Sequence, residues 1–151
     1  MKAISSIDDV SVVWYNEYMD IYRRTKTTVT LLNYHFVFCP RYRRKVFLID
    51  GLEELFKASV VQICEQNDVV VLAMECHVDH CHLFVSMPPT MSPSSFMQTL
   101  KSNTSRILRS TFPDVLKSPS LWTRSFFAST AGNVSSETIR RYVETQKTRG
   151  C

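Results

Sequence analysis

The sequence lacks the features that mark secreted and membrane-spanning proteins. No apolar run approaches the roughly 20 residues of a transmembrane helix, and residues 1–10 have neither the basic start nor the apolar stretch of a secretory signal. The five cysteines are odd in number and never form a C-x-x-C pair, which argues against a disulfide framework and against a zinc knuckle. We therefore expect a cytoplasmic protein with no membrane partner and one globular domain over residues 1–151, of which residues 1–21 form an N-terminal extension.

Charged residues are segregated along the chain, although the net charge is only +4. Residues 21–49 carry seven Lys or Arg and no acid, residues 50–79 carry one Lys and seven acids, and residues 101–149 carry nine Lys or Arg and three acids. Two basic blocks that flank an acidic one predict a basic surface that faces a polyanion. A single basic run is more often just a solvated face.

The order of the predicted elements indicates an α+β fold. We predict strands over 28–38, 69–76, 80–87 and within 121–130, and helices over 52–65, over 93–111 and from about 137 onward. The second and third strands are joined by a short turn at 78–79, which predicts an antiparallel hairpin. The whole order suits an antiparallel sheet with helices packed on one face, a ferredoxin-like or RRM-like sandwich. The opposite face of the sheet is then free to carry functional side chains.

The first two helices have N-terminal signals in the sequence. Asp50 is followed three residues later by Glu53, which matches a capping box. Ser92 precedes Pro93, an arrangement that suits a cap and the first helical position. Apolar residues recur on one face of each helix, so we expect both helices to pack against the sheet.

His80 and His82 are the most informative pair in the chain. On a strand, residues two apart point to the same face, so the two imidazoles would lie side by side and could hold one metal ion. Cys81 would point the other way, into the core. An incidental polar pair on a strand face explains this short stretch equally well.

Other chemistry-bearing residues lie outside this pair. Tyr142 and Gln146 are four apart on the last helix and so share a face, although half-buried packing would also account for Tyr142. The segment 41–45 holds four cations and one tyrosine, which suits a nucleic-acid backbone as well as an exposed basic turn. Lys101 and Arg109 follow one exposed line of the second helix. Together these features suggest metal-assisted phosphoryl transfer with a tyrosine nucleophile.

Four segments give the sequence a specific resemblance to a known family. They are residues 31–47 (LLNYHFVFCPRYRRKVF), 79–89 (DHCHLFVSMPP), 121–127 (LWTRSFF) and 139–146 (IRRYVETQ). In this order they resemble the single-tyrosine HUH transposases of the smallest prokaryotic insertion sequences, the TnpA-like enzymes and their REP-associated tyrosine transposase relatives. The resemblance extends from about residue 22 to residue 147.

The resemblance implies roles for individual residues. His80 and His82 match the metal-binding histidines of the HUH motif, Tyr142 matches the nucleophile, and Gln146 matches the third metal ligand. Asp79 matches an acid that is common before the motif. Two positions depart from the pattern, because Cys81 replaces a bulky hydrophobic residue and Val78 replaces the usual proline. His77 matches no functional position, and we interpret it as structural.

The resemblance also implies an activity and its partners. Family members are homodimers with composite active sites that bind hairpins in single-stranded DNA, and they cleave and rejoin the strand through a 5′-phosphotyrosine intermediate with Mg²⁺ or Mn²⁺. The residues that we expect to contact DNA are Arg41, Arg43, Arg44, Lys101 and Arg109. One alternative is a non-catalytic single-stranded nucleic-acid-binding module in which Tyr34, Phe36 and Phe38 stack on bases. Another is a metal hydrolase that uses an activated water and forms no covalent adduct.

Overall fold

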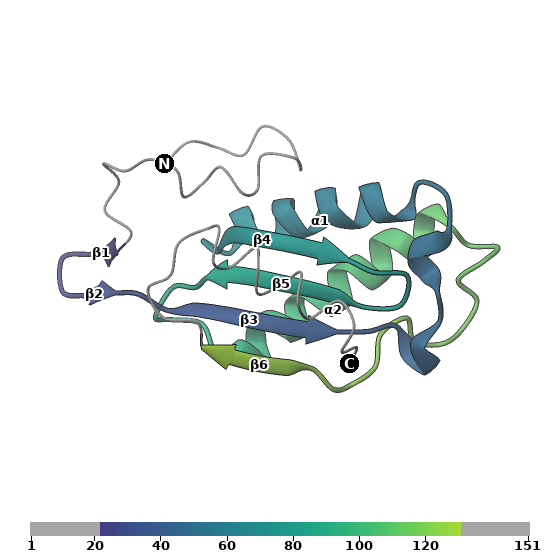
Figure 1. Cartoon of the computed structure of the whole chain (residues 1–151). Coiled ribbons are helices and arrows are strands. Elements are labelled where there is room, and N and C mark those ends of the chain that lie inside the picture. The colour runs from purple at the N-terminus through teal and green to yellow at the C-terminus, as the bar shows by residue number, and fades with distance from the viewer. Residues whose placement is uncertain (1–21, 131–151) are drawn as a thin grey trace.

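The computed structural model describes residues 22–130. Four strands form an antiparallel sheet in the order β4-β5-β3-β6 (Figure 1). These strands are β3 (Asn33–Phe38), β4 (Val70–Cys76), β5 (Cys81–Ser86) and β6 (Phe127–Thr130). β4 and β5 form the predicted hairpin, and β3 lies beside β5 even though helix α1 and strand β4 separate them in the sequence.

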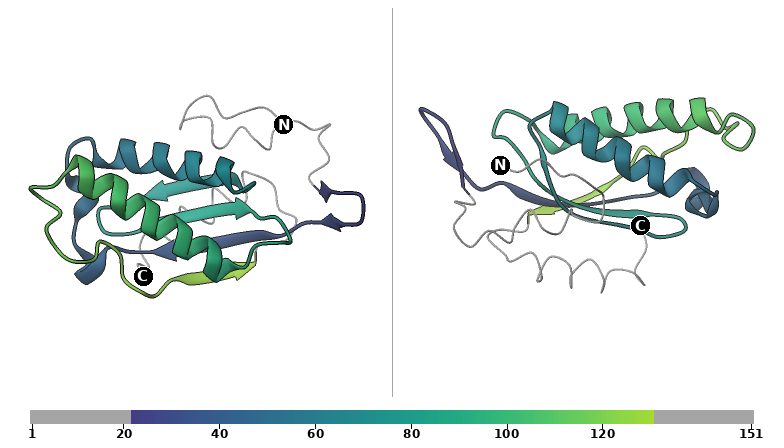
Figure 2. Two further views of the ribbon diagram at one scale, coloured as in Figure 1. Left: turned by 180° about the vertical axis from the view of Figure 1, so that it is seen from behind. Right: turned by 90° about the horizontal axis from the view of Figure 1, so that it is seen from above.

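Two helices cover one face of this sheet, as the right-hand view of Figure 2 shows. They are α1 (Leu52–Gln66), between β3 and β4, and α2 (Pro93–Thr111), between β5 and β6. The resulting order, strand, helix, two strands, helix, strand, is that of the ferredoxin-like sandwich. The predicted fold class is therefore confirmed. Within residues 22–130, no helix is both long enough and apolar enough to cross a bilayer.

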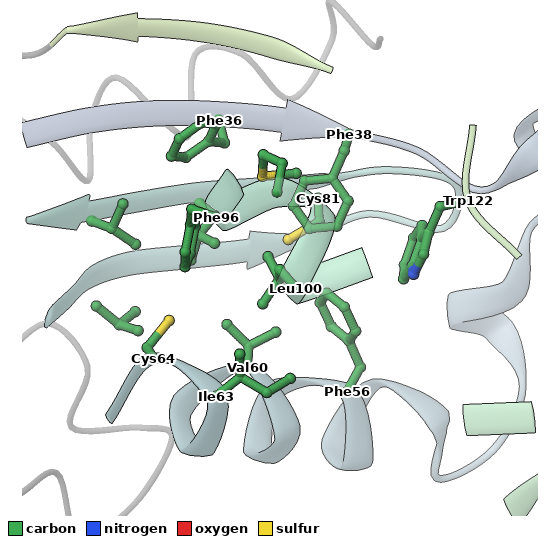
Figure 3. Close-up of a cluster of buried hydrophobic side chains, with 14 of the residues drawn as sticks. Phe36, Phe38, Phe56, Val60, Ile63, Cys64, Cys81, Phe96, Leu100 and Trp122 are labelled. Atoms are coloured by element: carbon green, nitrogen blue, oxygen red, sulfur yellow. The ribbon is translucent and has the colours of Figure 1, made fainter. Parts of the chain in front are cut away.

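The main core lies between the sheet and the helices. Phe36 and Phe38 of β3 point toward the helices, as does Cys81 of β5, and all three side chains are buried with Phe56 and Leu100 (Figure 3). Because side chains alternate along a strand, the residues between them point to the opposite face. That face carries His35 and Val37 of β3 and His82 and Phe84 of β5.

The predicted long strand over 28–38 is wrong in one respect, because the structure divides it. Val29–Thr30 forms a short strand, β2, that pairs with β1 (Arg23–Arg24) in a separate ribbon beyond the end of the sheet (Figure 1). The chain then leaves this ribbon and joins the main sheet as β3 at Asn33. The side chain of Arg23 ties the ribbon to the body through an ion pair with Asp68, at 3.0 Å, and a hydrogen bond to the Ser86 carbonyl.

The predicted Asp50 cap is also wrong. Gly51 is the N-cap of α1, with φ of 81°, and no side chain caps the helix. The left-handed backbone at Gly51 is open to glycine at little cost, so the chain turns into the helix one residue after Asp50. The second cap is confirmed, since the Ser95 amide donates to Ser92 Oγ at 3.1 Å and Pro93 is the first residue of α2.

Two short 3-10 helices connect β3 to α1. The first, η2 (Arg41–Arg43), follows Pro40, and the second, η3 (Val46–Leu48), precedes the turn into α1. The main chain of Pro40 forms a β-bridge with Trp122, and the Arg41 amide donates to the Leu121 carbonyl at 2.8 Å. These contacts hold the basic segment at one end of the sheet.

Candidate functional site

The two histidines of the HUH motif lie at the start of β5. The β4–β5 turn is closed by a hydrogen bond from the His77 amide to the His80 carbonyl, at 2.8 Å. His80 directly precedes the strand and His82 is its second residue, so both rings project from the same face. Their centroids are 5.1 Å apart and both side chains are buried, at 3% and 1% exposed. The side-by-side imidazoles predicted from the spacing are present, and Cys81 between them is buried in the core.

His80 is held by the carboxylate that precedes it. Nδ1 of His80 lies 2.7 Å from Oδ1 of Asp79. An ionised carboxylate only accepts hydrogen bonds, so Nδ1 carries the proton and Nε2 of a neutral ring keeps its lone pair. Nε2 is buried and has no hydrogen-bond partner within the described part of the chain. This arrangement is typical of a metal-binding histidine that a carboxylate orients.

Asp79 is in turn held by the basic segment. Nη2 of Arg43 lies 3.1 Å from the second oxygen of Asp79, Oδ2. Burial by itself would raise the pKa of Asp79, but the hydrogen bond with His80 and the charge of Arg43 outweigh it and lower the pKa. Asp79 is therefore ionised at neutral pH. Each of its oxygens has a different partner.

His82 contacts a third histidine on the neighbouring strand. Nδ1 of His82 lies 3.1 Å from Nε2 of His35, and the His35 ring stacks on Phe84 with centroids 4.4 Å apart. Burial and the nearby His82 lower the pKa of His35 from 6.5 to about 4, so His35 is neutral at physiological pH. When Nδ1 of His82 donates this hydrogen bond, Nε2 of His82 keeps its lone pair.

All four histidines of the sequence belong to one cluster. The His77 ring stacks on His80 with centroids 4.7 Å apart, and the His35 ring stacks on His82 with centroids 5.4 Å apart. His35 was not identified from the sequence as a partner of His82. A signal was present, because a histidine in the apolar strand around it is unusual, but only the pairing of β3 with β5 shows that it supports His82.

The described residues fit part of a metal site. Two neighbouring imidazoles, each with Nδ1 in a hydrogen bond, are suitable ligands for a divalent ion through Nε2. Among residues 22–130, no group of three or more His, Cys, Asp or Glu side chains could hold a metal. An ion at this pair would therefore need ligands from elsewhere in the protein, from water or from a substrate phosphate.

The basic segment carries an exposed aromatic ring. Tyr42 is 76% exposed, and the guanidinium carbons of Arg41 and Arg44 lie 5.5 and 5.7 Å from the centre of its ring. Tyr42 and Arg43 both have positive φ angles, 62° and 50°, which are costly for residues with side chains. Arg43 reaches from this segment to Asp79, which joins the basic segment to the turn that carries His80.

Lys101 and Arg109 contact the segment that leads from α2 to β6. Nζ of Lys101 donates to the carbonyls of Thr123 and Ser125, at 2.9 and 2.7 Å. The guanidinium of Arg109 donates to the carbonyls of Ser118 and Pro119. These hydrogen bonds give both cations a structural role, and their predicted DNA contacts stay predictions.

The aromatic platform of the non-catalytic alternative is not available. Phe36 and Phe38 are 0% and 1% exposed and point into the core beneath the helices. Tyr34 is partly buried, and its ring lies against Phe36 with centroids 5.9 Å apart. Because these residues alternate onto the helix-covered face, they cannot stack on bases at the sheet surface.

Four predicted features lie outside the described residues. They are the N-terminal extension over 1–21, the last helix from about residue 137 onward, Tyr142 and Gln146. The structure therefore brings together His80, His82, Asp79 and the segment 41–44, and the proposed nucleophile and third ligand stay predictions.

Comparison with known proteins identifies the family. Residues 28–146 match the family described as IS200-like transposases. The transposase of insertion sequence IS200 from Salmonella typhimurium LT2 is 35% identical over 117 residues, covering 75% of each chain. The ISDra2 transposase TnpA of Deinococcus radiodurans is 30% identical over 121 residues, covering 76% of this chain and 84% of that protein.

Solved structures share the fold. A crystal structure of a candidate transposase from Deinococcus radiodurans R1 superposes with a TM-score of 0.67 at 29% identity, covering 82% of this chain and 97% of that one. A REP-associated tyrosine transposase bound to a REP hairpin superposes with a TM-score of 0.56 at 16% identity, covering 83% of this chain and 69% of that one, a likeness of fold alone. From the sequence match and its extent, the chain belongs to the IS200-like transposase family.

Proposed function

We propose that this transposase cleaves and rejoins single-stranded DNA through a covalent bond to Tyr142. The observation that carries the proposal is the buried pair His80 and His82, with Asp79 on Nδ1 of His80 and Nε2 of that ring turned to no partner in residues 22–130. A transposase of this family needs a site that acts on phosphodiesters, and this pair is suited to bind the metal for it.

His80, His82 and Gln146 are the residues that would hold a divalent ion, Mg²⁺ or Mn²⁺. Such an ion supplies polarisation of the scissile phosphate and stabilises charge on the leaving 3′ oxygen. Asp79 fixes the tautomer of His80, and in the tautomer that we propose for His82 its Nδ1 donates a hydrogen bond to Nε2 of His35. In both rings these contacts make Nε2 the nitrogen that would bind the ion.

Tyr142 is the proposed nucleophile. Its phenolic oxygen forms a bond to phosphorus while the bond from phosphorus to the 3′ oxygen breaks. The phenolic proton passes to water, and the 3′ oxygen takes up a proton to become a free hydroxyl. One phosphoester replaces another, so the reverse attack by a 3′-hydroxyl rejoins the strand without ATP.

The segment 41–44 is the proposed DNA contact nearest the metal ligands. Its guanidinium groups suit phosphate oxygens, and the exposed Tyr42 ring suits an unpaired base. A protein of the same fold has been solved with a REP hairpin, which supports a hairpin-bearing single strand as the substrate. Lys101 and Arg109 complete the proposed set of DNA contacts.

A single nucleophile per chain favours a homodimer with composite active sites. Exchange of two DNA ends requires two cleavages, and each chain supplies one Tyr142. We propose that the tyrosine of one subunit acts at the histidine pair of the other.

The test is incubation with labelled single-stranded DNA that carries a hairpin, in the presence of Mg²⁺ or Mn²⁺. We expect a protein–DNA adduct that survives denaturation. Tyr142→Phe should bind the hairpin without forming the adduct. His82→Ala should abolish cleavage while hairpin binding stays largely intact, since His82 would hold the ion and does not belong to the basic segment.

Other outcomes would identify the alternatives. Cleavage that leaves a free 5′-phosphate and no adduct would indicate a metal hydrolase with an activated water. Hairpin binding that is unchanged in Tyr142→Phe, with no cleavage by the wild-type protein, would indicate a non-catalytic binding module. Loss of both binding and cleavage in His82→Ala would indicate a structural role for that histidine.

A further inference from the structure

We propose that Arg43 is a positioning residue for the metal site and acts on the ligand His80 through Asp79. The inference rests on the proposed role of His80 as a metal ligand. It adds a role for Arg43 that is separate from a contact with DNA. It also makes the basic segment part of the metal site.

A continuous line of contacts supports this role. Nη2 of Arg43 lies 3.1 Å from Oδ2 of Asp79, and Oδ1 of Asp79 lies 2.7 Å from Nδ1 of His80. Beyond His80, the line ends at the buried Nε2 atom, which has no hydrogen-bond partner in the part of the chain that is described. The line therefore leads from a surface cation to the atom that would bind the ion.

Asp79 needs a second partner to hold this orientation. It sits in the turn between β4 and β5, and its side chain is 21% exposed, so water can reach the carboxylate. A carboxylate with one hydrogen bond can rotate toward solvent and release His80. With Arg43 on Oδ2, rotation would break an ion pair as well as the hydrogen bond on Oδ1.

The backbone that places Arg43 beside Asp79 is strained. Tyr42 and Arg43 are both in the left-handed region, and the Arg43 amide donates to the Pro40 carbonyl at 2.9 Å. A second tie joins the two segments, because the Phe47 amide donates to the Val78 carbonyl at 3.3 Å. Strained backbone of this kind persists where surrounding contacts hold it, and it is common near functional sites.

The direction of the effect distinguishes positioning from general electrostatics. Arg43 is a cation near a site for another cation, so by charge alone its removal should tighten metal binding. If Arg43 instead positions His80 through Asp79, its removal should weaken metal binding. Arg44 provides a matched control, because it carries the same charge in the same segment and stacks near Tyr42 instead of pairing with Asp79.

The test measures Mn²⁺ affinity of the full chain without DNA, by electron paramagnetic resonance of free Mn²⁺. Mutation of a carboxylate that hydrogen-bonds a metal-bound histidine typically lowers metal affinity by about 10–100-fold, so we expect Asp79→Asn to weaken binding by about tenfold or more. Arg43→Ala should weaken binding severalfold, and Arg43→Lys should restore part of the loss. The double variant Arg43→Ala/Asp79→Asn should bind no more weakly than Asp79→Asn. Arg44→Ala should bind Mn²⁺ at least as tightly as wild type.

Several results would overturn the proposal. Arg43→Ala that binds Mn²⁺ as tightly as Arg44→Ala would show that the contact with Asp79 does not position the ligand. Additive losses in the double variant would show that Arg43 acts by another route. Thermal unfolding followed by circular dichroism identifies any unfolded variant, and Arg43→Gln then replaces Arg43→Ala.

The same titration separates this inference from the proposed metal site. If wild type binds Mn²⁺, His82→Ala does not and Arg43→Ala binds it as wild type does, the proposed metal site stands and only the positioning role of Arg43 is wrong. If the wild-type protein binds no Mn²⁺, both the proposed metal site and the role of Arg43 are wrong.

Discussion

His35 is a buried histidine in a largely apolar strand. It is 1% exposed, stacked on Phe84 and hydrogen-bonded to His82. Burial and the neighbouring histidine lower its pKa from 6.5 to about 4. A histidine that stays neutral when folded makes the protein sensitive to acid, because the unfolded chain binds the proton more readily.

We predict a loss of stability between pH 6.5 and about pH 4 that is due to His35. Below pH 6.5 His35 is protonated in the unfolded state but stays neutral in the folded state. The free energy of unfolding therefore falls, by up to about 3 kcal/mol as the pH approaches the pKa of His35 in the folded protein. Above pH 7 His35 should contribute no pH dependence. Urea unfolding with a chelator present, at several pH values, measures this effect.

The matched control is His35→Gln. Glutamine does not titrate, and its amide oxygen can accept the same hydrogen bond from His82. The difference in unfolding free energy between wild type and variant should therefore change with pH over the interval in which His35 resists protonation. A constant difference would contradict the neutral state of His35.

Local alternation was enough to predict the geometry of His80, Cys81 and His82. The i, i+2 spacing on a strand puts the two imidazoles on one face and the thiol on the other, whatever the rest of the fold. The support from His35 and Arg43 could not be predicted in this way. This support depends on the pairing of β3 with β5 and on the path of the segment after β3, which brings Arg43 to Asp79. The residues near the motif predict neither.

At the level of elements, the start of α1 shows how a local rule can miss by one residue. Asp50 and Glu53 have capping-box spacing, but the helix begins after Gly51, which adopts φ of 81°. A glycine next to a potential capping residue can become the N-cap itself, because glycine adopts the left-handed region without strain. Ser92 has no such neighbour, and its predicted cap is present.

This difference predicts the stabilities of three variants. Gly51→Ala should lower the free energy of unfolding by about 1–2 kcal/mol, because alanine is strained at positive φ. Ser92→Ala should cost about 1 kcal/mol for the lost cap. Asp50→Ala should change stability by less than about 0.5 kcal/mol, as is usual for exposed positions. Chemical denaturation of the three proteins tests the order, and an Asp50→Ala cost equal to that of Ser92→Ala would contradict the assigned cap.

The divided strand at 28–38 is a second case at this scale. Its β-branched and aromatic residues favour extended backbone, and strands β2 and β3 both lie within it. The change of partner, from β1 for Val29–Thr30 to β5 and β6 for Asn33–Phe38, is a tertiary event. Propensity measures the preference of a residue for a strand and carries no information about its neighbour.

At the level of the whole molecule, the order of elements was sufficient to predict the sandwich. Short connections and one apolar face per helix leave few arrangements for four strands and two helices. The site is only partly defined by the same logic, since Tyr142 and Gln146 lie outside the described residues. Their proposed roles rest on matching motifs, and the proposed dimer rests on the need for two cleavages.

Mixing two inactive variants tests the composite active site. His82→Ala keeps Tyr142, and Tyr142→Phe keeps the histidine pair. If the tyrosine acts on the partner's histidines, each mixed dimer has one intact site, and random mixing of symmetric dimers restores about a quarter of the wild-type sites. The adduct should form only on the His82→Ala subunit. No adduct after exchange of subunits, confirmed by differently tagged chains, would indicate that each subunit uses its own tyrosine.

The central claim is that Tyr142 becomes covalently joined to the 5′ side of a cleaved DNA strand. The most direct measurement is mass spectrometry of peptides from the adduct, after digestion of both the protein and the DNA. We predict a peptide that contains Tyr142 and carries a nucleotide through its 5′ phosphate. A nucleotide on any other residue, or cleaved DNA with a free 5′-phosphate and no modified peptide, would contradict the claim.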